Sequence, residues 1–341
     1  MNDAMKIRVN NFDLIRLLAA LQVAVKHCLV HFEVGTNYID FLSIFPGVPI
    51  FFFISGFLIF TSYKRSKLLY NFAVNRVLRI FPALIICCFV SIGLAASTGF
   101  LTTEIIFNQK FFIWVLAQLS IVQFYNPDFL RQYGVGVMNG SLWTISVELQ
   151  FYIITPVLAF LVLKKKWVWA ALLVTGVAAN LAMPFVPGEF FAKLYSVSSI
   201  PWIYMFIGGA LFTELPKLQE KILNANLWLL LFLYLLSCFC TVRFGLGSLG
   251  NDIGPVNYLL LVLLIFKLAF SQPGLSEKIL RKNDISYGIY IFHMPILNWV
   301  MYKHAYSNQA SVAFVLLLTI CVAILSWFLI EKPALSLKEK L

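Results

Sequence analysis

The chain has 341 residues, of which 61% are apolar and only 12% are charged, and its formal net charge is +11. An average soluble domain has about 45–50% apolar and about 25% charged residues. The charged residues of this chain are too few to form the surface of a soluble protein. Apolar runs recur along the whole length and leave no room for a sizeable soluble domain. We therefore predict an integral membrane protein with one domain, residues 1–341.

The positive charge is placed in short clusters between the apolar runs, which is the pattern of loops on the cytoplasmic side of a membrane. No polar face carries these residues together, so we expect no nucleic-acid partner. The first apolar run has no small-residue cleavage site after it and is expected to be kept as the first span. The clusters are Lys6 and Arg8; Lys64, Arg65 and Lys67; Lys164, Lys165 and Lys166; Lys217 and Lys221; Lys278, Arg281 and Lys282; and Lys332, Lys338 and Lys340.

Eleven apolar runs approach the length of about 20 residues that a spanning helix needs. They fall near 12–31, 43–62, 79–99, 111–125, 142–163, 167–186, 198–214, 227–243, 255–271, 286–302 and 310–330. If 111–125 crossed the membrane, the Lys164–Lys166 cluster would fall outside, against the positive-inside tendency. We therefore predict an all-α bundle of about ten transmembrane helices, with both termini cytoplasmic and residues 100–141 forming a long outer segment.

The first span contains an unusual number of ionisable residues, which are costly in a membrane and suggest a functional site. Arg16 and His27 are eleven residues apart, about three helical turns, so they share one face and are separated by about 16 Å along the axis. Asp13 lies one turn from Arg16, near enough to pair with it. The alternative is a snorkelling arginine and a buried structural histidine.

Two more arginines, Arg76 and Arg79, lie three residues apart on one helical face at the cytoplasmic start of the third span. Guanidinium groups present a planar set of donors that suits phosphates. Flanking charges of the positive-inside type are the simpler alternative. However, Arg16 should lie at a similar depth, and three arginines at one level favour a phosphate-binding site.

Glu148 is a carboxylate in an apolar run, with Trp143 before it and Tyr152 one turn after it. A carboxylate in such surroundings neutralises or finds a partner. Our topology places Glu148 in the outer half of its span, at the depth of His27. We predict a Glu148–His27 pair that holds the imidazole ready as a general base; a structural hydrogen bond between helices is the alternative.

Five residues are expected to line the same pocket: Trp143, Tyr152, Ser55, Gly56 and His293. Ser55 and Gly56 lie in the second span, where small residues permit close helix approach, and His293 precedes a proline in a later span. The six cysteines have no paired C-x-x-C spacing, and no metal-ligand motif is present, so we expect no metal site.

Six ordered motifs resemble the acyltransferase 3 family of membrane O-acyltransferases. They are FDLIRLLAALQVAVKH, FFFISGFLI, RVLRIFPAL, SLWTISVELQFY, SYGIYIFHMP and WFLIEKPA, and they extend from residue 12 to residue 334. The family's arginine and histidine of the first span correspond to Arg16 and His27. Its R-x-x-R pair corresponds to Arg76 and Arg79, and its glutamate to Glu148. The resemblance covers nearly the whole chain.

The resemblance implies transfer of an acyl group, usually acetyl from acetyl-CoA, to a sugar hydroxyl of a surface or exported glycan such as an O-antigen. Acetyl-CoA or another acyl-CoA would be a co-substrate, with no tightly bound cofactor. A free or lipid-linked glycan would be the acceptor, and membrane lipid would surround the protein. His27 and Glu148 would be catalytic, while Arg16, Arg76, Arg79 and Asp13 would bind the donor.

The expected location is the bacterial inner membrane. Because the chain ends shortly after its last span, we expect no soluble extracytoplasmic domain. The sequence does not indicate the acceptor sugar, the length of the acyl group or the oligomeric state. A secondary transporter, with the buried charges as a proton or substrate pathway, is the alternative from another class.

Overall fold

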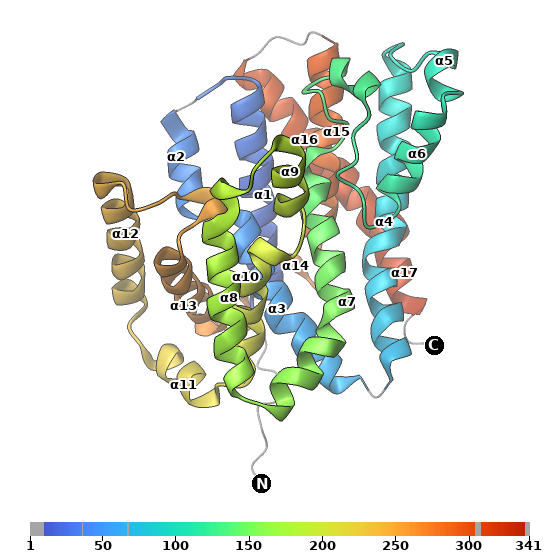
Figure 1. The fold of residues 1–341 in the computed structure, drawn as a ribbon. Helices are drawn as coiled ribbons and strands as arrows, with labels where there is room; N and C mark the ends of the chain where they lie inside the picture. Colours follow the sequence, from blue (N-terminus) through green and yellow to red (C-terminus); the bar gives the residue numbers. More distant parts are fainter. Residues whose placement is uncertain (1–9, 36, 67, 304–307, 338–341) are drawn as a thin grey trace.

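The computed structural model describes residues 10–35, 37–66, 68–303 and 308–337, and these residues form helices joined by short loops (Figure 1). No β-strand occurs in this described part. The α-helices are α1 (Phe12–His31), α2 (Asn37–Ile44), α3 (Gly47–Arg65), α4 (Leu69–Ser97), α5 (Thr103–Ile106), α6 (Gln109–Gln118), α7 (Trp143–Lys164), α8 (Trp167–Ala182), α9 (Glu189–Ser196), α10 (Ile203–Phe212), α11 (Pro216–Asn224), α12 (Leu227–Phe244), α13 (Pro255–Ser271), α14 (Leu275–Leu280), α15 (Ser286–Tyr302), α16 (Gln309–Ser326) and α17 (Lys332–Ser336).

Shorter 3-10 turns are η1 (Asp128–Gln132), η2 (Gly140–Leu142), η3 (Met183–Phe185), η4 (Ile200–Trp202) and η5 (Gly250–Asp252), and η6 (Trp327–Glu331) is a π turn.

Within the described residues, seven helical segments are long and apolar enough to cross a membrane, and the pair α9 and α10, bent by 48°, would make an eighth. The all-α membrane bundle is thus confirmed, and the protein is an integral membrane protein. The remaining two predicted spans, 255–271 and 286–302, correspond to α13 and α15, which have 17 residues each. The count of ten therefore stays a prediction.

The predicted non-spanning stretch 111–125 contains α6, a helix of 10 residues, about half the length that crossing requires. Figure 1 places α5 and α6 beside one end of α4. The orientation of the chain stays a prediction. Of the basic residues on which it partly depends, Lys6, Arg8, Lys67, Lys338 and Lys340 lie outside the described residues.

The centre of the bundle is made by α1, α3 and α15. α1 packs on α3 and α15, α15 also contacts α16 and α4, and α10 packs against the other side of α3 (Figure 1). α1 carries Arg16 near one end and His27 near the other, while Asp284 lies just before α15 and His293 lies in the middle of that helix. The contact between α1 and α15 therefore places those residues in the interior of the bundle.

The segment before α7 enters the bundle along α15. The backbone N–H of Val135 donates to Asn298, the Asn139 side chain donates to the backbone oxygen of Ile291, and Ser141 donates to that of Tyr290. As the chain moves from residue 135 to 141, its partners move eight residues back along α15, about 12 Å. α7 therefore begins deep in the bundle rather than at its surface.

α3 and α10 approach each other so closely that backbone meets backbone. A Cβ atom on Gly56 would lie 1.9 Å from the backbone oxygen of Phe206, and one on Gly209 would lie 2.0 Å from that of Phe53. Gly56 therefore permits helix packing, as expected for small residues between membrane helices. It packs against α10, and its predicted place in the pocket lining is corrected accordingly.

We expect Gly56→Ala to destabilise the protein by about 1–3 kcal/mol, because the added methyl group forces α3 and α10 apart. Thermal unfolding in detergent measures the effect as a lower midpoint. Gly93→Ala in α4 is the matched control, since a Cβ there meets no atom of the described residues within 4 Å. Equal midpoints for the two variants would contradict the tight α3–α10 contact.

Candidate active site

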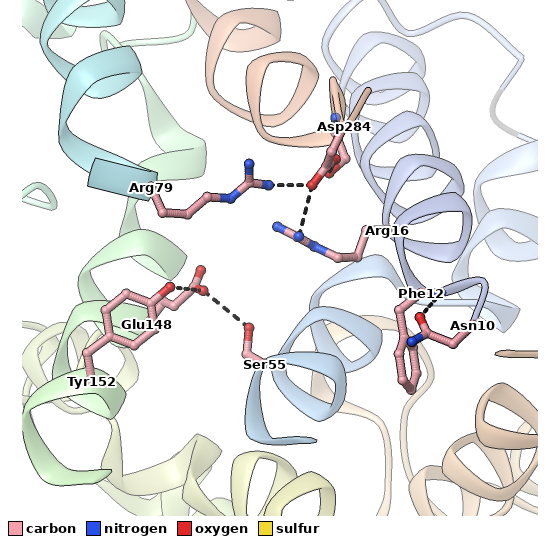
Figure 2. A network of polar contacts seen from close by, with 9 residues as sticks. Asn10, Phe12, Arg16, Ser55, Arg79, Glu148, Tyr152 and Asp284 are labelled. Carbon is pink, nitrogen blue, oxygen red and sulfur yellow. Dashed lines mark hydrogen bonds and ion pairs between the residues drawn. The ribbon is translucent and has the colours of Figure 1, made fainter. Parts of the chain in front are cut away.

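One end of the bundle interior holds two arginines that share a single carboxylate (Figure 2). Arg16 of α1 donates from Nη1 to Oδ2 of Asp284 over 3.0 Å, and Arg79 of α4 donates to the same oxygen. The three side chains are mostly buried, with Asp284 only 11% exposed. The predicted convergence of Arg16 and Arg79 is therefore observed, but with a counterion between them.

Asp284 is fixed by the first turn of α15. Its second oxygen, Oδ1, accepts from the backbone N–H of Ser286 at 3.1 Å and from the Ser286 hydroxyl. Burial acts to raise the pKa of Asp284, but Arg16, Arg79 and these two hydrogen bonds hold it well below its usual range. The carboxylate is therefore charged at any physiological pH.

Asp284 was missed by the sequence reasoning, and it corrects one prediction. In the described part of the chain no ion pair joins Asp13 to Arg16; the aspartate that Arg16 contacts is Asp284, and Asp13 is exposed. A short sequence pattern around Asp284 could have indicated its role. An aspartate two residues before a serine, at the start of an apolar helix, is a common side-chain cap.

Arg76 lies beside Arg16 and Arg79, and N–H donors of its guanidinium group remain available for a ligand. Its Nη2 donates weakly to Ser62 at 3.4 Å, its guanidinium lies 5.6 Å from the centre of the Tyr152 ring, and its buried Nε has no hydrogen-bond partner among the described residues. A cavity of about 50 Å³ touches Arg16, Arg76 and Arg79 together. The three arginines thus line one space, as the sequence predicted.

Glu148 belongs to the same region. Its Oε1 accepts hydrogen bonds from Tyr152 at 2.6 Å and from Ser55 at 3.2 Å (Figure 2), and all three residues line the arginine cavity. The predicted Glu148–His27 pair is therefore wrong. The reason is the depth of α7: because this helix starts inside the bundle, Glu148 lies at the level of Arg16 and not at that of His27.

His27 is instead hydrogen-bonded to His293 of α15. Nδ1 of His27 lies 2.8 Å from Nε2 of His293, and Nδ1 of His293 lies 3.1 Å from the backbone oxygen of Ile289. A carbonyl oxygen only accepts, so neutral His293 carries its proton on Nδ1 and accepts at Nε2. His27 therefore donates from Nδ1, which leaves its Nε2 with a free lone pair.

The arginines and the histidine pair are separated by a similar length on two helices. Arg16 and His27 are eleven residues apart on α1, which is about 16 Å, and Asp284 precedes His293 by nine residues, about 14 Å. A narrow cavity of about 30 Å³ lies between, lined by Arg16, Glu148 and Tyr290 among others. The Tyr290 ring lies 6.0 Å from that of His293.

A larger pocket of about 380 Å³ is lined by the segment before α7, including Asn139 and Gly140, and Trp143 is part of its wall. The interior thus has three polar parts: the arginine cavity, the buried histidine pair and this wider pocket. In the described residues, no group of three or more His, Cys, Asp or Glu side chains could hold a metal ion.

A polytopic helix bundle with three arginines at one end of its interior and a buried histidine pair at another level fits a membrane-embedded group-transfer enzyme. The family model of the acyltransferase domain matches residues 9–331. The chain belongs to this acyltransferase 3 family and is a membrane acyltransferase.

Curated relatives agree with this assignment. The chain is 33% identical to nodulation protein 10 of Rhizobium leguminosarum bv. viciae, covering 97% of this chain and 95% of the relative. It is 28% identical to an O-acetyl transferase of Shigella phage Sf6, covering 96% of each. Peptidoglycan O-acetyltransferase OatA of Listeria monocytogenes is 26% identical, and the match covers 85% of this chain and 49% of that protein. No solved structure matches the chain.

Proposed function

We propose that the protein transfers an acetyl group from cytoplasmic acetyl-CoA to a hydroxyl group of a surface or exported glycan. It would act in a bacterial inner membrane with both termini cytoplasmic. Two relatives are named as O-acetyltransferases, which supports the acyl group and the bond formed. The observation that carries the proposal is the pair of polar centres, arginines and histidines, about 14–16 Å apart inside one bundle.

The arginine cavity is the proposed site for the phosphates of CoA. Asp284 already neutralises Arg16 and Arg79 in part, so Arg76, with its unpartnered Nε, offers the strongest remaining attraction for an anion. The separation of about 14–16 Å is of the order of an extended pantetheine arm. The thioester would then reach the histidine pair while the nucleotide stays at the cytoplasmic side.

His27 is the proposed general base. Its free Nε2 takes the proton of an acceptor hydroxyl, whose oxygen bonds to the thioester carbonyl carbon. The carbon–sulfur bond then breaks, and the CoA thiolate leaves and takes the proton back from His27. His293 keeps the imidazole oriented by accepting from its Nδ1. Glu148 supplies negative charge beside the arginines rather than acting on His27.

We expect Arg76→Ala to weaken acetyl-CoA binding by about 10–100-fold, since a hydrogen bond to a charged group contributes about 1.5–3 kcal/mol. Calorimetry or radiolabelled acetyl-CoA binding to protein in nanodiscs measures this. Arg65→Ala, at the exposed end of α3, is the matched control and should bind like the unsubstituted protein.

The proposal as a whole is tested by mass spectrometry of the host's surface glycans with and without the chain. Glycan acetyl esters that disappear on deletion and return with the intact gene support it. Unchanged glycans, together with no measurable acetyl-CoA binding, would refute it.

A further inference from the structure

The pocket of about 380 Å³ with Trp143 and Asn139 in its wall is lined by none of the three arginines assigned to the donor, and its walls differ from the arginine cavity. It combines indole rings with amide side chains in a volume that is ordinary for a small-ligand site. We propose that this pocket is the acceptor subsite and binds one uncharged pyranose unit of the glycan. This inference rests on the proposed function.

Two tryptophans provide the apolar wall. The rings of Trp143 and Trp202 lie 5.3 Å apart with 45° between their planes. Trp202 is fixed because its Nε1–H donates to the backbone oxygen of Ser196 at 2.7 Å. A pyranose ring has faces made of C–H groups, and such faces pack well on the large, rigid surface of an aromatic ring.

Two amide side chains leave polar atoms unused at this pocket. Gln123 is 3% exposed; its Oε1 accepts from Ser146 at 3.3 Å, but its Nε2 has no partner in the part of the chain that the structure describes. Asn126 donates from Nδ2 to the backbone oxygen of Gly136 at 2.8 Å, while its Oδ1 likewise has no partner among those residues. One spare donor and one spare acceptor match sugar hydroxyls, which both donate and accept. Buried polar atoms without partners are costly, so a ligand that pairs them gains affinity.

The charges on the pocket favour a neutral ligand. Its wall carries one cation, Lys193, and one anion, Asp252, so neither sign dominates. The arginine cavity, by contrast, is built for an anion. Two ligands of different charge, a CoA and an uncharged sugar, would therefore enter from opposite ends.

The pocket is coupled to the histidine pair through α15. Asn139, in the pocket wall, donates to the backbone oxygen of Ile291 at 2.8 Å, and His293 is the second residue after Ile291. Gly140, also in the wall, faces Met294: a Cβ on it would meet the end of that side chain at 3.6 Å. A sugar in the pocket would thus lie next to the helix turn that orients His27.

The test uses protein in phospholipid nanodiscs, which avoids sugar-based detergents. The probes are methyl β-D-glucopyranoside and methyl N-acetyl-β-D-glucosaminide, and binding is observed by saturation-transfer NMR. We expect signal from at least one probe with the unsubstituted protein. Gln123→Leu and Trp143→Leu should each weaken that binding by about fivefold or more, the effect of losing one hydrogen bond or one ring contact. No signal with the unsubstituted protein overturns the inference.

Two matched variants control for general effects. Gln132→Leu removes an exposed amide of η1, and Trp228→Leu removes a tryptophan of α12 that is 74% exposed; both should bind the probes normally. Acetyl-CoA affinity is measured on every variant. A pocket variant that binds acetyl-CoA and both probes like the unsubstituted protein overturns this inference alone. If the unsubstituted protein did not bind acetyl-CoA, that result would instead count against the proposed function.

Discussion

Replacing His27 by alanine should lower the rate of acetyl transfer by about 10²–10⁴-fold, which is the usual contribution of a general base. Acetyl-CoA affinity should stay near that of the unsubstituted protein, because His27 is about 16 Å along α1 from Arg16. The measurement is transfer of labelled acetyl from acetyl-CoA, together with direct donor binding. If the transfer rate and the acetyl-CoA affinity fell by the same factor, the separation of donor binding from chemistry would be contradicted.

The role of His293 can be tested in the same assay with a matched pair of variants. Gln at position 293 offers an amide oxygen near the place of Nε2, so it can still accept from His27, whereas Leu cannot. His293→Gln should therefore retain clearly more activity than His293→Leu. His31→Ala is the control: its ring centre is 6.0 Å from that of His27, without a hydrogen bond between them in the described structure. Equal activity of His293→Gln and His293→Leu would show that His293 does not position His27 through this hydrogen bond.

The second large effect concerns the carboxylate between the arginines. Asp284→Ala leaves Arg16 and Arg79 buried without their counterion, and breaking a buried ion pair in this way costs about 3–5 kcal/mol. We expect a markedly lower midpoint of thermal unfolding, or failure to accumulate folded protein. The matched control is Glu277→Ala, whose exposed pair with Lys282 at 3.4 Å should contribute at most about 1 kcal/mol.

The pH dependence follows from the depressed pKa of Asp284. The stabilisation by this carboxylate is complete above the unfolded pKa of about 3.9 and is lost as the pH falls through the lower folded value. Between pH 5 and pH 8, Asp284 should therefore add no slope to the stability. Unfolding midpoints of the unsubstituted protein and Asp284→Asn, measured across that range, should differ by a constant amount. A difference that shrinks towards pH 5 would show that the carboxylate is already taking up a proton there.

Much of the arrangement could be predicted from the sequence because charges stand out against an apolar background. Arg16, Arg76 and Arg79 were expected at one level, and they line one cavity. The spacing of Arg16 and His27 depends only on helix geometry, so it also holds. That the stretch 111–125 does not span the membrane followed from the Lys164–Lys166 cluster, and the short α6 agrees with it.

Pairings between helices could not be predicted, because they depend on depth. The position of Glu148 was inferred by assuming that its span starts at the membrane surface. In the structure the preceding segment runs inward along α15, held by Asn298 and Ile291, and this shifts Glu148 towards Arg16. Asp284 was overlooked for a related reason: it lies in a loop by sequence, although it is buried in space.

The π turn η6 is a place where the end of the chain can change in length by one residue. A π turn contains one residue more than an α turn, and here the wider turn places Glu331, only 2% exposed, where its carboxylate accepts from Ser326 at 3.0 Å. Removing one residue from this turn would restore regular α winding and leave the helix after it in nearly the same orientation, because the π turn contains one residue more than an α turn. The contact of Lys332 with Asn283 should then be kept. Deletion of a single residue should therefore be more acceptable in η6 than inside a regular helix such as α16, where it would rotate everything after it by about 100°.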